Sequence, residues 1–208
     1  RASYRGSLLV DDVAALIDQV GRPVHLVGHD WGAAVAWMLA ASRPELLRSL
    51  VAVSVGHPAA FQKSMFTSDQ WRRSWYMAFF QVPLLPERLT AWRALADRFL
   101  GAAGMDAGMI ERFHREFPTA ASLGGPIGWY RGLPLSQGSG LGGKVTVPTT
   151  MVWSDRDVAL GRTAIDLTER YVRAPYRLEV LDGVSHWIPD QAAEELAGFI
   201  LNRVRETA

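Results

Sequence analysis

The chain has 208 residues, of which 49% are apolar, and its 22 basic side chains nearly balance its 21 acidic ones. This composition is typical of one globular domain, and the absence of a dense Lys or Arg block argues against a nucleic-acid partner. No apolar run reaches the roughly 18 residues of a membrane span. The sequence contains no cysteine, which excludes disulfides and thiolate metal sites and makes the cytoplasm the expected compartment.

The first quarter of the chain alternates helices with strands. A helix is expected over residues 7–20 and is ended by Gly21. Strands are expected over 23–30 and 47–56, and the helix between them, over 31–42, is apolar on nearly all sides, which predicts burial. The predicted apolar stripe of the first helix consists of Leu9, Val13, Leu16, Ile17 and Val20.

The last third of the chain repeats this alternation. Strands are expected over 145–155 and 176–183, with helices over 163–172 and 190–204. The closing helix carries an apolar stripe made of Leu196, Phe199, Ile200 and Val204. Strands that alternate with helices predict a parallel sheet covered by helices on both faces.

The middle of the chain has a different texture. Aromatic-rich helical segments over 68–80, 86–100 and 105–117 precede a glycine-rich stretch over 123–144, and no convincing strand occurs among them. Such an insertion between two strands of an α/β sheet predicts a lid over the carboxyl ends of the strands, where ligands bind. The expected division is a first core segment over 1–57, a helical cap over 58–143 and a second core segment over 144–208.

A carboxylate stands at the tightest point of the sequence Gly28-His29-Asp30-Trp31-Gly32. At the start of a helix, Asp30 could serve only as an N-cap. However, the pattern of glycine, any residue, nucleophile, any residue, glycine between a strand and a helix is that of a nucleophile elbow. A carboxylate at this position can attack without a base and then forms an ester that water must hydrolyse.

Hydrolysis of such an ester needs a base, and the loop after the last expected strand supplies His186. A carboxylate after the preceding strand would hold the imidazole. Asp157 is preferred because it stands three positions beyond Ser154, which ends the strand, as in the pattern of the α/β-hydrolases that this segment resembles, and Asp155 is the fallback. The order nucleophile, acid, histidine is that of α/β-hydrolases.

At these motifs the chain resembles the epoxide-hydrolase branch of the α/β-hydrolase family. The matching segments are VGHDWG, the HP that follows the second strand, the helical cap, WSDRDVAL and GVSHW. The resemblance implies a partial α/β-hydrolase core with an inserted cap, and it implies no cofactor and no metal. It also implies that Asp30 attacks a small apolar epoxide and that water activated by His186 releases a vicinal diol. Two cap tyrosines of the family match Tyr76 in WYMAFFQVP and Tyr130 in GWYRG, and they would donate hydrogen bonds to the epoxide oxygen.

The nearest alternative is a haloalkane dehalogenase. That family shares the aspartate nucleophile and uses the tryptophan next to it, here Trp31, to bind the departing halide. The two tyrosine motifs favour an epoxide. The other histidines, which are His25, His29, His57 and His114, are interpreted as structural.

A further alternative is an inactive binding remnant, because family members carry four strands and an HGxP segment before the region that matches here. That segment supplies one backbone donor of the oxyanion hole, and the Trp31 N–H is the other expected donor. Without a neighbour, the strand VHLV would leave an apolar edge exposed. We therefore expect a complementing N-terminal segment or a homodimer.

Overall fold

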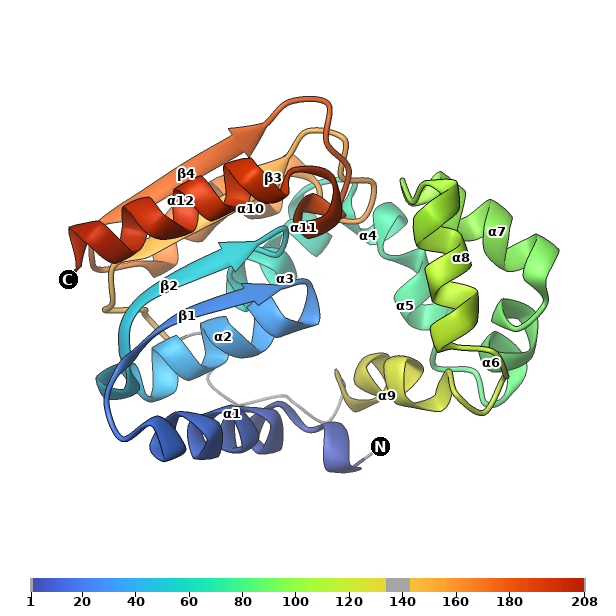
Figure 1. The fold of residues 1–208 in the computed structure, drawn as a ribbon, viewed down its shortest axis with the longest axis horizontal. Coiled ribbons are helices and arrows are strands. Elements are labelled where there is room, and N and C mark those ends of the chain that lie inside the picture. Colours follow the sequence, from blue (N-terminus) through green and yellow to red (C-terminus); the bar gives the residue numbers. More distant parts are fainter. Residues whose placement is uncertain (1, 134–142, 208) are drawn as a thin grey trace.

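The computed structural model describes residues 2–133 and 143–207. Four parallel strands form one sheet in chain order. The strands are β1 (Val24–His29), β2 (Leu47–Val53), β3 (Thr149–Ser154) and β4 (Tyr176–Leu181). Because all strands run the same way, their carboxyl ends lie together at one end of the sheet. Figure 1 shows β1 and β2 pointing toward the separate group of helices drawn in green and yellow.

Helices cover both faces of this sheet, as the alternation of side chains along the central strands requires. Leu50 and Ala52 of β2 pack into the larger core cluster, whereas Val51 and Val53 pack into the smaller one. The larger cluster involves α1 (Gly6–Val20), α2 (Trp31–Ser42) and α10 (Arg162–Thr168), and the smaller one involves α11 (Ile188–Gln191) and α12 (Ala193–Glu206). Short 3-10 helices are η1 (Ala2–Tyr4), η2 (Pro44–Leu46) and η4 (Glu169–Tyr171).

The predicted apolar stripe of the first helix is partly wrong. The buried residues of α1 are Gly6, Val10, Ala14 and Ile17. Leu16 and Val20 are exposed. The helix packs on α2. Leu9 and Val13 are partly buried against the larger core cluster, so the predicted stripe is right at Leu9, Val13 and Ile17 and wrong at the two exposed positions.

Three predicted boundaries also change. The third strand begins at Thr149 rather than at 145, because Pro148 has no N–H to pair, and Val145 keeps only an isolated bridge. The closing helix is divided at Ala192, whose φ of −141° is not helical, into α11 and α12. The helix predicted over 163–172 ends at Thr168 and continues as a 3-10 turn.

Helices alone make up the insertion among the described residues 58–133. They are α3 (Pro58–Thr67), α4 (Gln70–Arg73), α5 (Trp75–Phe79), α6 (Leu85–Thr90), α7 (Arg93–Ala102), α8 (Ala107–Glu116) and α9 (Gly124–Gly132). We call this group the cap, and α5 to α8 lie to one side of the sheet in Figure 1. The glycine-rich prediction falls in part on residues 134–142, which lie outside the described residues, and the domain limits stay predictions.

The strand β1 lies at one edge of the sheet. In the described part of the chain it pairs with β2 alone, and its Val27 is 41% exposed. Unpaired strand edges recruit further strands. The open side of β1 is thus the place where a complementing segment or a second copy would pair, and such pairing stays a prediction. Among the described residues, no helix has the length and apolar character needed to cross a bilayer.

Candidate active site

The turn between β1 and α2 places Asp30 in a strained conformation. Its φ is 52° and its ψ is −122°, a region that non-glycine residues rarely occupy. A side chain at Gly28 would put its Cβ 2.5 Å from the carbonyl oxygen of Gly32, so this close return of the chain requires glycine. The Asp30 side chain makes no capping hydrogen bond to α2. The geometry therefore presents the carboxylate instead of using it as a cap.

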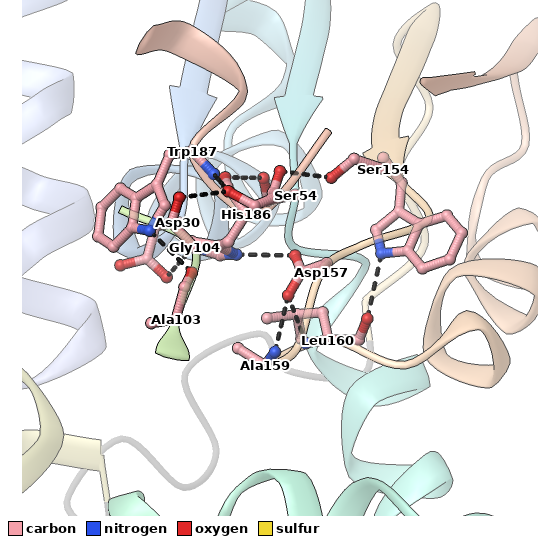
Figure 2. Close-up of polar contacts among 12 residues, drawn as sticks. Asp30, Ser54, Ala103, Gly104, Ser154, Asp157, Ala159, Leu160, His186 and Trp187 are labelled. Carbon is pink, nitrogen blue, oxygen red and sulfur yellow. Dashed lines mark hydrogen bonds and ion pairs between the residues drawn. The ribbon is translucent and has the colours of Figure 1, made fainter. Parts of the chain in front are cut away.

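Three side chains from three strand ends meet at this point, as Figure 2 shows. The Nδ1 of His186 lies 2.7 Å from Oδ2 of Asp157, and its Nε2 lies 3.4 Å from Oδ1 of Asp30. The side chain of Asp157 is fully buried and that of His186 is 8% exposed, whereas that of Asp30 is 40% exposed. Of the three side chains, that of Asp30 is therefore the most exposed, and that of Asp157 is enclosed.

The two candidate acids have different environments. Oδ1 of Asp157 accepts hydrogen bonds from the backbone N–H groups of Ala159 (2.8 Å) and Leu160 (2.9 Å), which leaves Oδ2 to His186. Oδ1 of Asp155 instead accepts from the N–H of Gly183 (2.7 Å), across the turn after β4. Of the two, the structure brings Asp157 to the histidine, and the fallback Asp155 is engaged elsewhere.

The charges of this group stabilise one another. Burial lowers the pKa of His186, but hydrogen bonds to Asp157 and Asp30 outweigh it and raise the pKa to about 10. Burial raises the pKa of Asp30, but the hydrogen bond and charge of His186 and the backbone N–H of Trp31 hold it below its ordinary value. These interactions therefore favour the protonated form of the His186 imidazole beside Asp30.

This coupling leads to a titration prediction. Asp30→Asn removes one of the two carboxylates that raise the pKa of His186, so that pKa should fall below its value of about 10. The measurement is the pH titration of the His186 ring signals by NMR in both proteins. An unchanged midpoint would show that the Asp30 charge does not act on the imidazole.

Two phenols from the cap lie across the pocket from Asp30. Tyr76 of α5 and Tyr130 of α9 have ring centroids 5.8 Å apart, and Tyr130 meets the Trp31 ring edge-on at 5.0 Å. Burial raises the pKa of Tyr76, with Tyr130 and Asp30 adding to the rise, and burial and Asp30 likewise raise the pKa of Tyr130. Both hydroxyls are therefore protonated donors at neutral pH.

The helix that carries Tyr130 is fastened to its neighbours in the cap. Gln81 donates from Nε2 to the carbonyl of Tyr130 (2.7 Å). Arg131 forms an ion pair with Glu87 and donates from Nε to the carbonyl of Phe80 (2.9 Å). These contacts fix the chain at Tyr130 and at the residue that follows it.

Two cavities meet at these residues. One has a volume of about 600 Å³ and the other about 100 Å³, and Asp30, Tyr76 and Tyr130 line both. Trp31 lines only the smaller cavity, and His186 lines only the larger one. The remaining walls are mostly apolar, so the pocket suits an uncharged ligand.

The loop that carries His186 is held by side chains that the sequence analysis did not assign to the site. The carbonyl of His186 accepts hydrogen bonds from Nε2 of His29 and from Oγ of Ser54, both at 2.9 Å. Ser154 donates from Oγ to the carbonyl of Ser185 (2.7 Å). The sequence signal for these hydrogen bonds was a serine at the end of each of two buried strands. Ser54 follows β2 directly, and Ser154 is the last residue of β3.

The histidines interpreted as structural all have partners. Besides His29, the ring of His25 lies 2.8 Å from Oγ of Ser49. The Nδ1 of His57 accepts from the N–H of Ala59, and the ring of His114 contacts Asp97.

Comparison with known proteins places the chain in a family. The alpha/beta hydrolase family matches residues 2–199. The AB hydrolase superfamily protein YfhM of Bacillus subtilis is 34% identical over 195 residues, which cover 89% of this chain and 68% of that protein. Epoxide hydrolase 4 of Mus musculus is 29% identical over an alignment of 221 residues, gaps included. The alignment covers 98% of this chain and 60% of that protein. The chain thus spans about 60% of the length of the mouse relative.

A solved structure shows the same fold. The crystal structure of the Bacillus megaterium epoxide hydrolase in complex with an inhibitor matches with a TM-score of 0.79 at 22% identity. The match covers 98% of this chain and 77% of that one. The chain therefore belongs to the alpha/beta hydrolase family, and its relatives include epoxide hydrolases.

Proposed function

We propose that the protein hydrolyses small apolar epoxides to vicinal diols through an ester on Asp30. The observation that carries the proposal is the position of two protonated phenols, Tyr76 and Tyr130, in the same pocket as an ionised carboxylate. An epoxide needs a nucleophile on carbon and a donor on oxygen, and this pocket offers both.

The first step would form the ester. An oxygen of Asp30 attacks one epoxide carbon, the bond from that carbon to the ring oxygen breaks, and Tyr76 and Tyr130 donate hydrogen bonds to the developing alkoxide. That oxygen then takes up a proton from one of these phenols, and the phenol regains a proton from solvent. The Asp30 charge is lost in the ester, and with it one of the two interactions that raise the pKa of His186.

The second step would release the diol. His186, held by Asp157, removes a proton from water as the water oxygen attacks the ester carbonyl. The backbone N–H of Trp31 is the proposed donor to the resulting oxyanion. The intermediate then collapses, and the diol oxygen receives the proton from His186. The second proton of the attacking water leaves the Asp30 carboxyl for solvent, which restores the carboxylate. The partners required are the epoxide and water.

The tyrosine pair distinguishes this function from dehalogenation. Tyr76→Phe and Tyr130→Phe should each slow ester formation, and the double variant should nearly eliminate it, because a departing halide needs no phenol but an epoxide oxygen does. Single-turnover mixing with a styrene-oxide-type epoxide measures this rate.

A matched control is Tyr176→Phe. The Tyr176 hydroxyl is buried with no hydrogen-bond partner among the described residues, so its removal should leave ester formation unchanged. If both single variants at Tyr76 and Tyr130 keep the full rate, or if the parent releases halide from haloalkanes faster than it opens epoxides, the protein is a dehalogenase instead.

A further inference from the structure

A fully buried amide side chain joins the cap to the loop of the catalytic acid. Gln70, at the start of α4, is 0% exposed. Its Nε2 donates to the carbonyl of Ala159 (2.7 Å) and to Oγ of Ser74 (3.0 Å), and its Oε1 accepts from the N–H of Gly161 (2.8 Å). Both amide hydrogens are used and the oxygen is engaged, so the orientation of the amide is fixed.

The loop from Asp157 to Gly161 is consequently held from two sides. On one side Asp157 accepts from the N–H groups of Ala159 and Leu160, as Figure 2 shows. On the other side Gln70 binds the carbonyl of Ala159 and the N–H of Gly161. Because Oδ1 of Asp157 is bound to this loop, the position of Oδ2 toward His186 depends on where the loop lies.

The same amide reaches the helix that carries one of the phenols. Ser74, which accepts from Gln70, is the residue immediately before α5, and Tyr76 belongs to α5. Arg73 adds a weaker contact from Nη1 to the carbonyl of Asp157 (3.3 Å). The structure therefore connects the acid and the phenol through one buried side chain.

We propose that Gln70 is a positioning residue for the hydrolytic step, acting through Asp157 on His186. The proposal rests on the proposed function, because it assigns a separate hydrolytic step to the Asp157–His186 pair. Gln70 does not line either cavity, so its effect is exerted through the loop and not through contact with substrate.

The pH dependence of hydrolysis reports this action. Among the described residues, the titratable groups that face His186 are Asp30, Asp157 and His29. In the ester Asp30 is uncharged, and burial followed by the His186 charge lowers the pKa of His29. Asp157 is then the group that raises the pKa of His186. A loosened Asp157 should lower that pKa, and hydrolysis should reach half its plateau at a lower pH.

The test is Gln70→Met, which keeps the length of the side chain and removes its three hydrogen bonds. Hydrolysis of the ester should slow about 10- to 100-fold, as expected for a small displacement of a catalytic group. Ester formation should slow less, and the pH midpoint of hydrolysis should fall. Single-turnover kinetics followed by mass spectrometry separate the two steps.

Three further variants complete the experiment. Gln62→Met makes the same change at an exposed position of α3 and should leave both steps unchanged. Gln81→Met removes the bond to the Tyr130 carbonyl and should slow ester formation without moving the pH midpoint of hydrolysis. If Gln70→Met does not fold, Gln70→Glu is the second variant. It keeps the side-chain volume but replaces the amide donor to the Ala159 carbonyl with a carboxylate oxygen, and it should likewise slow ester hydrolysis more than ester formation.

The outcomes separate this inference from the proposed function. If the parent protein forms no ester on Asp30, the proposed function is wrong and the inference falls with it. If the parent forms the ester and the Gln70 variant hydrolyses it at the parent rate, the inference alone is wrong. Equal slowing of both steps with an unchanged pH midpoint would assign Gln70 a purely structural role and would also overturn it.

Discussion

Replacing Asp30 with alanine should lower epoxide turnover at least about 100-fold, the minimum loss expected when a catalytic group is removed. The residue combines an exposed carboxylate with a strained backbone, and neither feature is needed for capping α2. Glu116 also lines the larger cavity, but it pairs with Arg112 and does not line the smaller cavity, whereas Asp30 lines both and pairs with His186. Steady-state hydrolysis of a styrene-oxide-type substrate measures the loss.

A matched control is Asp12→Ala on the exposed side of α1. It should retain the parental rate, because an exposed helix position away from the pocket contributes little to activity or stability. Turnover by Asp30→Ala within a few fold of the parent would remove Asp30 from the role of nucleophile.

Replacing His186 with glutamine should separate the two chemical steps. Attack by a carboxylate needs no base, whereas attack by water on the ester does. The variant should therefore react once with an epoxide and stop, leaving Asp30 covalently modified. Intact-mass spectrometry after mixing should show an increase equal to the mass of the substrate.

The same experiment compares the two candidate acids. Asp157→Asn should slow release of the ester, because the bond to Nδ1 of His186 loses its charge. Asp155→Asn alters only the contact with the Gly183 N–H and should release it at the parental rate. His25→Gln, a change at the amino end of β1, serves as the histidine control. Unmodified, folded His186→Gln protein after incubation with epoxide would contradict the assignment of the base.

Much of the site was predictable because its residues stand at strand ends in a fixed chain order. The glycines around Asp30 indicated a tight turn, and a parallel sheet must bring the ends of β1, β3 and β4 to one edge. The preference for Asp157 over Asp155 followed the spacing from the strand, and the structure places Asp157 against His186. The catalytic roles of these residues are proposals that kinetics must test.

Other features were not predictable because they depend on contacts between segments far apart in the sequence. The role of Gln70 depends on a loop 89 residues away in the chain, and Ser54 bonds a carbonyl 132 residues away. The buried face of α1 depends on how this helix packs on α2. Periodicity alone therefore predicted burial for Leu16, which is exposed. Local patterns specify elements and turns, whereas these pairings arise only when the elements pack.

The most direct test of the account is the fate of solvent oxygen at Asp30. Repeated epoxide turnover in oxygen-18 water should place the label in the Asp30 carboxylate, because water attacks the carbonyl carbon of the ester. The water oxygen then stays in the carboxylate, and the original Asp30 oxygen leaves with the diol. Peptide mass spectrometry of the segment that contains Asp30 locates the label. An ester intermediate on Asp30 predicts heavy oxygen in Asp30 after many turnovers and none without substrate. Active enzyme whose Asp30 stays unlabelled would show that water attacks the epoxide directly.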